Sequence, residues 1–253
     1  MGSLHQGHLD LVKQSKSGTD ITIVSIFVNP AQFNDAADLA KYPRNLDRDL
    51  ELLKNSGADY VFIPDEDEVY PEKPLLKFDF SDLGTVLEGA FRPGHFNGVG
   101  IIVTKLFHII RPTHLYLGQK DLQQVAIIKR LVKDLSFDIQ IIVLPTRREA
   151  DGLAMSSRNA LLNPQEREAS VILNKSLDYA KGELLKGANW FEVKDNIKQM
   201  FREEPLANLE YFELVRSDTM EKVSEITLND SFSVCTAASI GGIRLIDNMT
   251  VTN

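Results

Sequence analysis

The sequence predicts an α/β protein in which a parallel sheet wrapped by helices precedes a smaller α+β unit. Short apolar runs alternate with helical patterns through the first 145 residues. Strands that alternate with helices in this order pair in parallel. Beyond Pro145, two helical patterns come first and three strand-like runs follow. We therefore expect a domain over residues 1–146 and a smaller α+β domain over residues 147–253.

Four apolar runs in the first part predict buried strands, because each is short and rich in branched or aromatic residues. They are Ile21–Val28, Tyr60–Ile63, Leu115–Leu117 and Ile139–Leu144. Helical spacing of apolar residues predicts helices between them, over Asn45–Asn55, Gly100–Ile110 and Asp121–Asp134. An amphipathic run directly after His8 predicts one more helix.

In the second part, Asn163 and Pro164 suit the N-cap and the first position of a helix. One apolar face of that helix follows at Ala169, Ile172, Leu173, Leu177, Ala180 and Leu184. A second helix is expected after Asn189, with Trp190, Val193, Ile197 and Phe201 facing inward. Three runs then predict strands of an antiparallel sheet, namely Leu209–Val215, Ser231–Ala237 and Ile243–Ile246.

Composition narrows the class of protein. The chain has 253 residues, of which 43% are hydrophobic and 25% charged, so it can bury the core of one large or two modest domains. No apolar stretch is long enough to span a bilayer, and we expect no leader. The lone Cys235 excludes an intrachain disulfide framework and fits the cytoplasm. A net charge of −8 argues against a nucleic-acid surface, so locally placed cations must hold any anionic ligand.

The first eight residues, Met1 to His8, are the most informative motif. His5 and His8 stand at the expected start of a helix, where unsatisfied backbone N–H groups attract phosphate. Gly7 has no Cβ and lets a ligand approach the main chain. The alternative is half of a metal site, but no cluster of cysteines or further histidines supplies the other ligands.

Polar side chains also follow the first expected strand. Asn29 and Gln32 lie where the carboxyl ends of parallel strands border a ligand crevice, and their amides suit a hydroxy acid. The alternative is that Asn29 and Pro30 simply form a turn.

Two further clusters are weaker. The run from Lys41 through Tyr42 to Asp49 offers a mobile polar flap and, in Asp49, a carboxylate for magnesium; a solvated helix start explains it equally. The run Arg92–Gly98 fits either a ligand loop or a surface turn.

Gly118–Gln124 predicts a phosphate contact more strongly. Lys120 ends an expected strand and can neutralise phosphate, while Gln124 lies one turn later and can face the same crevice. The alternative is an ordinary N-cap at Asp121 beside an exposed lysine.

Met155-Ser156-Ser157-Arg158, followed by Asn159, stands at the expected domain boundary. Its hydroxyls and guanidinium suit a polyphosphate, as part of either a lid or a plain linker.

In this shared order, the motifs resemble the pantothenate synthetase family within the superfamily of HIGH-motif nucleotidylyltransferases and class I synthetases. His5-Gln6-Gly7-His8 stands for the histidine motif, and Met155–Arg158 for the mobile phosphate-binding loop. The resemblance runs from Met1 to about Asp247. It includes Ser25–Phe33, Tyr42-Pro43-Arg44, Arg92–Gly98, Gly118–Gln124 and Arg244-Leu245-Ile246-Asp247-Asn248.

The resemblance implies a Rossmann-like sheet with helices on both faces, a C-terminal lid domain, a homodimer and an ATP-dependent ligation. Pantoate would attack the α-phosphate of ATP to form pantoyl adenylate, and β-alanine would then displace AMP. Catalytic roles would fall to His5, His8, Lys120, Ser156, Ser157 and Arg158. Met1, Gly118, Asp121 and Met155 would help bind ATP, while Gln32, Gln124, Asn29 and Tyr42 would bind substrate.

Two departures accompany the resemblance. Asp49 aligns with an acidic position associated with Mg²⁺, whereas Arg48 stands where some relatives are acidic. Family members carry a helix and a buried central strand ahead of the Met-Gly motif, so we expect this first strand to be missing.

A related adenylyltransferase that stops at nucleotide transfer, or a non-catalytic nucleotide-binding protein, would be the alternative functions.

Overall fold

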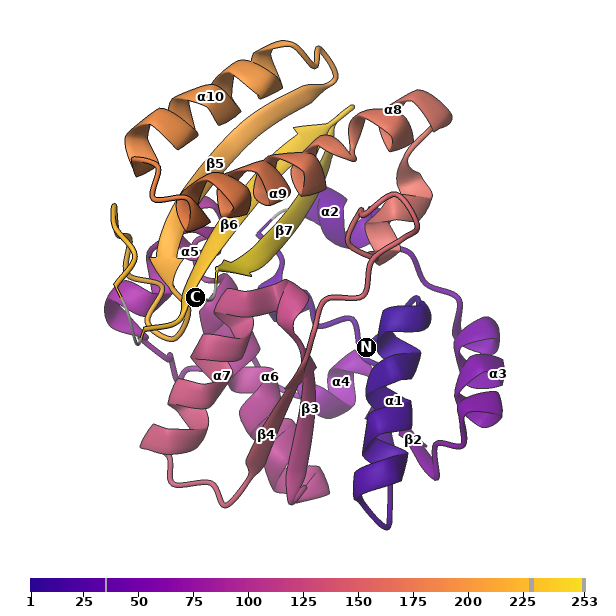
Figure 1. The fold of residues 1–253 in the computed structure, drawn as a ribbon. Helices are drawn as coiled ribbons and strands as arrows, with labels where there is room; N and C mark the ends of the chain where they lie inside the picture. The colour runs from indigo at the N-terminus through magenta and orange to yellow at the C-terminus, as the bar shows by residue number, and fades with distance from the viewer. Residues whose placement is uncertain (35, 228–229, 252–253) are drawn as a thin grey trace. The chain divides into compact units, whose positions relative to one another are not determined.

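A computed structural model describes residues 1–34, 36–227 and 230–251 of the chain (Figure 1). The chain divides into two compact units. Unit 1 holds Met1–Gly118 and Gln123–Pro145, and unit 2 holds Gln119–Leu122 and Thr146–Asn253. The assignment of the short stretch Gln119–Leu122 to unit 2 is a feature that the sequence did not predict.

The strands of unit 1 pair in parallel, as expected. β1 (Ile23–Ser25) pairs with β2 (Tyr60–Phe62), and β3 (His114–Gly118) pairs with β4 (Gln140–Leu144). Across the described residues these are two separate two-stranded sheets, so the expected single sheet is not what the structure shows. Whether a first central strand is missing stays a prediction.

β1 is shorter than the apolar run that predicted it. Beyond Ser25 the main chain still forms hydrogen bonds outside the strand. The N–H of Ile26 donates to the Phe62 carbonyl (2.9 Å), and the N–H of Phe27 donates to the Met1 carbonyl (3.1 Å). Apolar character therefore continues past the end of the regular ladder.

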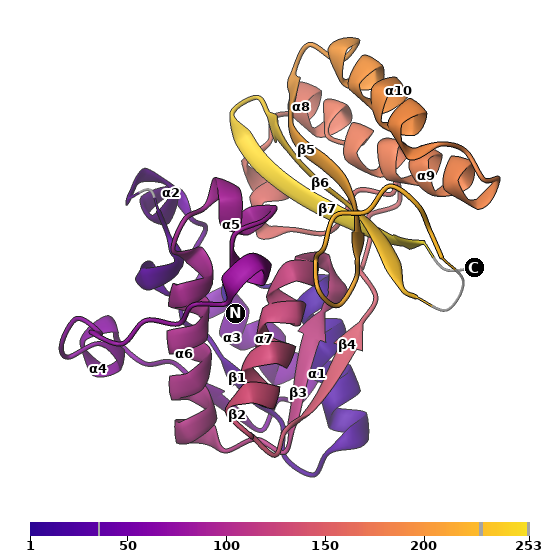
Figure 2. The same cartoon turned by 90° about the vertical axis from the view of Figure 1, so that its left-hand side faces the viewer.

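Helices flank the strands of unit 1. α6 (His95–Ile110) and α7 (Leu122–Asp134) lie on one side of β3 and β4, and α1 (Gln6–Gly18) lies on the other (Figures 1 and 2). α3 (Leu46–Ser56) packs beside α1. The shorter elements are α2 (Ala36–Lys41), α4 (Glu66–Val69), α5 (Glu88–Phe91) and the 3-10 turns η1 (Pro30–Gln32) and η2 (Ser81–Gly84).

Apolar clusters of described residues join the helices of unit 1 to its strands. Phe96, Val99 and Phe107 of α6 pack with Ile127 and Leu131 of α7 against the apolar side chains of β3 and β4. Leu4, Val12, Val24, Ile26 and Leu53 form another cluster, which joins α1 and α3 to β1. The helices are thus fixed to the strands by amphipathic faces that the periodicity predicted.

Unit 2 is an antiparallel sheet covered by helices. The sheet order is β5 (Ala207–Arg216), β6 (Phe232–Ile240), β7 (Ile243–Val251), and α9 (Ile172–Leu185) and α10 (Trp190–Arg202) pack on it. Its core contains all four predicted inward residues of α10, namely Trp190, Val193, Ile197 and Phe201. α8 (Pro164–Ala169) and the 3-10 turns η3 (Gln119–Asp121) and η4 (Ser157–Leu161) complete the unit.

The prediction of one continuous helix from Pro164 through Leu184 is wrong. α8 ends at Ala169 and α9 begins at Ile172, although all six predicted apolar positions are buried. Between them, the Ser170 hydroxyl donates to the Arg167 carbonyl (2.7 Å). The N–H of Val171 donates to the Glu168 carbonyl (3.3 Å) and that of Leu173 to the Ser170 carbonyl (3.2 Å), each three residues back, so the regular α-helical bonding is interrupted here. Periodicity of apolar residues does not reveal such a change of main-chain bonding.

Among the described residues, no helix is long and apolar enough to cross a membrane.

Candidate active site

The histidine pair lies at the N-terminal end of α1. His5 is the N-cap residue, and the main-chain N–H groups of His8 (2.8 Å) and Leu9 (3.2 Å) donate to its carbonyl. The two imidazole rings are 4.0 Å apart between centroids. The N–H of His5 donates to Nδ1 of His8 (3.3 Å), so a neutral His8 carries its proton on Nε2. This places an N–H donor beside the positive end of a helix, where anions bind.

Asp49 of α3 holds the segment that leads into this helix. Its two carboxylate oxygens accept the main-chain N–H groups of Ser3 (2.8 Å) and Leu4 (2.7 Å), and the residue is only 2% exposed. Met1 lies along the continuation of β1, with its nitrogen 2.7 Å from the Ser25 carbonyl oxygen. The described residues contain no group of three or more acidic, histidine or cysteine side chains that could hold a metal ion.

Asn29 and Gln32 come together after β1. Asn29 is 2% exposed and caps η1 by accepting the N–H of Ala31 (3.3 Å), which is the turn role weighed for it. Its Nδ2 also donates to Oε1 of Gln32 (3.3 Å) and to the Gly98 carbonyl (3.2 Å). The turn role of Asn29 is therefore confirmed, and the capped turn brings the two amides into contact, while their binding of a hydroxy acid stays a prediction.

Tyr70, which follows α4, is a site residue that the sequence did not reveal. Its hydroxyl donates to Oδ1 of Asn29 (2.7 Å), and the ammonium group of Lys105 lies 5.5 Å from its ring centroid. Burial, assisted by the nearby charge of Glu66, raises the pKa of Tyr70 to about 12. The phenol is therefore a donor at neutral pH, and it orients the Asn29 amide toward Gln32.

The predicted ligand loop Arg92–Gly98 is partly helical, since α6 begins at His95 after Gly94 in a left-handed conformation (φ 83°). Nδ1 of His95 (2.8 Å) and a guanidinium nitrogen of Arg92 (3.3 Å) both hydrogen-bond the main-chain carbonyl of Gln32. A Cβ on Gly98 would lie 2.2 Å from the Ala31 carbonyl oxygen, so the close approach of α6 to η1 requires glycine. This loop thus buttresses Gln32.

The other predicted substrate residues lie elsewhere in unit 1. Gln124 is half-buried in the first turn of α7, next to Gln123, whose Nε2 donates to the carbonyls of Leu83 (2.9 Å) and Val86 (2.8 Å). The ring of Tyr42 packs edge-on against Phe33, with centroids 5.7 Å apart. Gly118 ends β3 opposite Leu144.

The predicted cations of the site belong to unit 2. Lys120 lies in η3, 20% exposed, with its Nζ 3.6 Å from Oδ1 of Asp121. Asp121 ends η3 directly ahead of α7.

The segment Met155–Arg158, called here the phosphate segment, also lies in unit 2. The N–H of Met155 donates to the Arg147 carbonyl (2.9 Å). Ser156 is the N-cap of η4 and accepts the N–H of Arg158 (3.3 Å), while Ser157 is the first residue of that turn. The segment therefore leads into the 3-10 turn η4.

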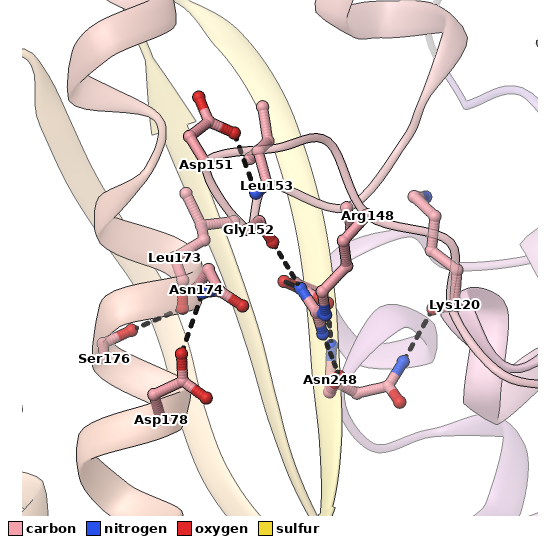
Figure 3. Close-up of polar contacts among 12 residues, drawn as sticks. Lys120, Arg148, Asp151, Gly152, Leu153, Leu173, Asn174, Ser176, Asp178 and Asn248 are labelled. Atoms are coloured by element: carbon pink, nitrogen blue, oxygen red, sulfur yellow. Dashed lines mark hydrogen bonds and ion pairs between the residues drawn. The ribbon is translucent and has the colours of Figure 1, made fainter.

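The structure thus groups the predicted residues by unit. The pairs His5 with His8 and Asn29 with Gln32 lie in unit 1, and Lys120 shares unit 2 with the phosphate segment. Besides Tyr70, sequence reasoning assigned no role to Arg148 (Figure 3), which forms a two-pronged ion pair with Asp247 in unit 2. The resemblance to a family had marked Asp247 and Asn248 only as part of a motif.

Comparison with known proteins covers the whole chain. The Pantoate-beta-alanine ligase family model matches residues 1–250. A pantothenate synthetase of Thermoanaerobacter sp. (strain X514) is 47% identical over 250 residues, covering 98% of this chain and 88% of the relative. One of Acetivibrio thermocellus is 47% identical over 252 residues, covering 99% and 89%.

Solved structures agree with these relatives. Pantothenate synthetase from Thermus thermophilus matches with a TM-score of 0.94 and 36% identity, covering 100% of this chain and 91% of that one. Pantoate-beta-alanine ligase from Francisella tularensis, complexed with beta-gamma ATP and beta-alanine, matches with a TM-score of 0.82 and 38% identity, covering 100% and 88%.

Proposed function

The chain belongs to the pantoate–beta-alanine ligase family, and from this premise we propose how its residues divide the work of an ATP-dependent ligation. The enzyme condenses pantoate with β-alanine to give pantothenate, AMP and pyrophosphate. The observation that carries this function is the match of residues 1–250 to the family, with relatives of the same name at 47% identity. These relatives support amide ligation, not an adenylyltransferase that stops at nucleotide transfer.

The chemistry explains why two kinds of site are needed. A carboxylate is a poor acyl donor, so the pantoate carboxylate first attacks the α-phosphorus of ATP, and pyrophosphate leaves. The β-alanine amine then attacks the acyl carbon, and AMP leaves with the carboxyl oxygen that was bonded to phosphorus. The protein's task is to position the reactants and to stabilise negative charge on the phosphates.

We propose that the phosphates of ATP bind to cations and N–H donors of the predicted motifs. Nε2 of His8 and the amino end of α1 would supply donors, and Lys120 would supply a positive charge. The residues proposed to contact ATP are Met1, His5, His8, Gly118, Lys120, Asp121, Met155, Ser156, Ser157 and Arg158. Residues 1–146 would then form the nucleotide-binding domain and residues 147–253 its lid.

We assign pantoate to the amides of unit 1. Gln32 is held on two sides, by the Asn29 amide and by the contacts of His95 and Arg92 with its carbonyl. Such a fixed amide suits a hydroxyl and a carboxylate, since it can donate and accept. Gln124 is the proposed second amide, with Tyr42 nearby in the proposed pocket.

Magnesium belongs to the proposal in a limited form. Asp49 does not fit a protein-held metal site, because its two oxygens are committed to main-chain N–H groups and no group of potential ligands surrounds it in the described residues. We therefore propose that Mg²⁺ enters bound to the ATP phosphates, and we route no chemical step through the protein's carboxylates.

The proposed setting is a cytoplasmic homodimer with no nucleic-acid or membrane partner. Cys235 is the single cysteine of the sequence, so no disulfide forms within the chain, which suits a reducing compartment, and the net charge of −8 disfavours a polyanion surface. Sedimentation equilibrium of the purified chain tests the dimer.

The function is tested by resolving the two steps. Pantoate-dependent exchange of labelled pyrophosphate into ATP should occur without β-alanine, and AMP should appear at a steady rate only when β-alanine is added. Exchange without any β-alanine-dependent AMP would indicate an adenylyltransferase. Tight ATP binding by calorimetry without exchange would indicate a non-catalytic nucleotide-binding protein.

A further inference from the structure

Two adjacent residues on β7, Asp247 and Asn248, bind two distant segments of unit 2; Figure 3 labels Asn248 together with Arg148 and Lys120. Both are buried, with the Asp247 side chain 1% exposed. One segment contains Lys120 and the other leads into the phosphate segment. The proposed function of the chain gives neither residue a contact with substrate.

Asp247 holds the approach to the phosphate segment through Arg148. The guanidinium donates to both carboxylate oxygens, with Nη1–Oδ2 at 2.7 Å and Nη2–Oδ1 at 3.0 Å. The same group donates to the carbonyls of Gly152 (2.9 Å) and Asn248 (3.1 Å). Arg148 also pairs with Ala154 across an isolated bridge, immediately before Met155. The turn that precedes the phosphate segment is therefore closed on itself and fixed to β7.

Asn248 holds η3 in the same manner. Its Nδ2 donates to two consecutive carbonyls, those of Gln119 (3.0 Å) and Lys120 (2.8 Å). Nε2 of Gln119 donates in turn to the Thr250 hydroxyl (2.5 Å). A single amide that spans two carbonyls fixes the main-chain conformation at Lys120, and hence the origin of its side chain.

The energetics of the Arg148–Asp247 ion pair indicate that it fixes geometry more than it adds stability. A buried ion pair gains little net stability, because desolvation offsets attraction, but its two-pronged geometry specifies one arrangement. Burial raises the pKa of Asp247, while the charge of Arg148 opposes that rise. A pair of apolar side chains would fill the same space, but it would not fix the position of the Arg148 turn along β7.

We propose that Asp247 and Asn248 are positioning residues that set the spacing between Lys120 and the phosphate segment, so that both meet one polyphosphate. This inference rests on the proposed function, which assigns ATP contacts to those segments. Both η3 and η4 pack against β7, so Lys120 and the phosphate segment are both positioned by the same strand. Displacing a catalytic group by about 1 Å weakens catalysis by about 100-fold in known cases, so a shared strand that fixes both segments would preserve the rate.

The inference is tested with Asn248→Ala, which removes the donor to both carbonyls, and Asp247→Asn, which removes the charge that holds Arg148. Each should raise the KM for ATP by about tenfold, following the loss of fixed geometry, and leave the KM for pantoate unchanged. Glu210→Gln is the matched control. It breaks the ion pair of Glu210 with Arg244 (2.5 Å), also on this sheet, and should leave both KM values unchanged.

A merely structural role would lower the folded fraction and thus the maximal rate, without raising the KM for ATP. An unchanged KM for ATP in both folded variants would overturn the inference. If Asn248→Ala fails to fold, Asn248→Ser, which is polar but too short to span two carbonyls, replaces it under the same criterion.

A double variant separates action through Lys120 from an independent effect. Lys120→Ala combined with Asn248→Ala should be no slower than Lys120→Ala alone, since Asn248 acts through the lysine. Multiplicative losses would contradict the assignment. Failure of the proposed function is distinct, because the unmodified chain would then show no pantoate-dependent exchange at all.

Discussion

At the scale of single residues, the contacts of Asn29 show how a buried amide fixes the turn that carries Gln32. One carbonyl oxygen accepts the N–H of Ala31 and the hydroxyl of Tyr70, while the amide nitrogen donates to Gln32 and Gly98. A buried amide with this many partners cannot rotate without leaving polar groups unpaired, which is costly. The Asn29 amide is therefore fixed, and it holds the Gln32 side chain, which we propose to bind pantoate.

The cations of the proposed phosphate site give a first prediction. Lys120→Ala and His8→Ala should each slow pyrophosphate exchange by about 100-fold, the order found for loss of one charge-stabilising donor. The loss should appear in the rate of exchange measured at saturating ATP and pantoate. Lys198→Ala is the control, since Lys198 pairs with Asp195 on the exposed surface of α10. Normal adenylate formation by either variant would contradict the assigned roles.

Tyr70 gives a second prediction, with a pH dependence. Tyr70→Phe should raise the KM for pantoate by about fivefold to tenfold, as expected for one lost hydrogen bond of about 1 kcal/mol. Because burial raises the pKa of Tyr70 to about 12, its O–H donor persists well above neutral pH. The ratio of kcat/KM between wild type and variant should therefore be equal at about pH 7 and about pH 9.5, below an ordinary tyrosine pKa near 10.

The opposite pH result is easily recognised. If the ratio falls toward one between those two pH values, the phenol has ionised in that range and is not the buried donor described.

At the scale of elements, a helix is fixed by a side chain from another helix. Asp49 of α3 accepts the N–H groups of Ser3 and Leu4, so the segment entering α1 is tied to α3 before the histidines begin. The i,i+4 pattern of charges in α3 suggested only a solvated helix start or a metal ligand. Neither reading anticipates a carboxylate turned inward onto the main chain.

This contact gives a third prediction. Asp49→Asn keeps the shape but replaces one accepting oxygen by a donor, so it should lower the free energy of unfolding by about 1–3 kcal/mol. The loss is measured by urea denaturation. The Mg²⁺ concentration that half-saturates activity should stay unchanged. A large shift of that concentration with unchanged stability would instead assign Asp49 to the metal.

At the scale of the whole molecule, each unit has its own apolar core. Leu177 is fully buried in the core of unit 2, and Leu53 is fully buried among Leu4, Val12 and Val24 in unit 1. The two cores contain different residues, so packing defects in one do not remove contacts from the other. Local stability can therefore differ between the units.

This separation gives a fourth prediction. Leu177→Ala should destabilise its unit by about 2–5 kcal/mol, the range for a buried leucine. Native-state hydrogen exchange should show lost protection in α9, α10 and β5–β7 and retained protection in α7. Leu53→Ala is the matched variant, and it should show the reverse pattern in α1 and α3. Equal loss of protection throughout the chain in both variants would show one cooperative unit.

Much of the local structure was predictable from the sequence. Asn189 caps α10, Asn163 caps α8 with Glu166 three residues on, and the predicted apolar face of α10 is buried. These features depend on neighbouring residues and on helical spacing, which the sequence displays directly. The break between α8 and α9 was missed, because it lies in the main-chain bonding around Ser170 and leaves the apolar spacing unchanged.

The candidate site was predictable only in its parts. The motif around His5 and His8 marks a helix start, and Lys120 follows a strand, so both positions follow from local patterns. Tyr70 could not be found in that way. It meets Asn29 across 41 positions of sequence, and no period or spacing connects the two.

The sequence by itself determined the longer helices apart from the break between α8 and α9, the strand directions, the order of the motifs and, through that order, the family. Each of these follows from local periodicity, capping residues or the succession of short patterns. Only the tertiary structure decided that Asn248 would meet Lys120 across 128 positions, and Asp247 meet Arg148 across 99. Such pairings depend on which segments a strand packs beside, and that is settled by the burial of the whole core rather than by any residue's neighbours in the chain.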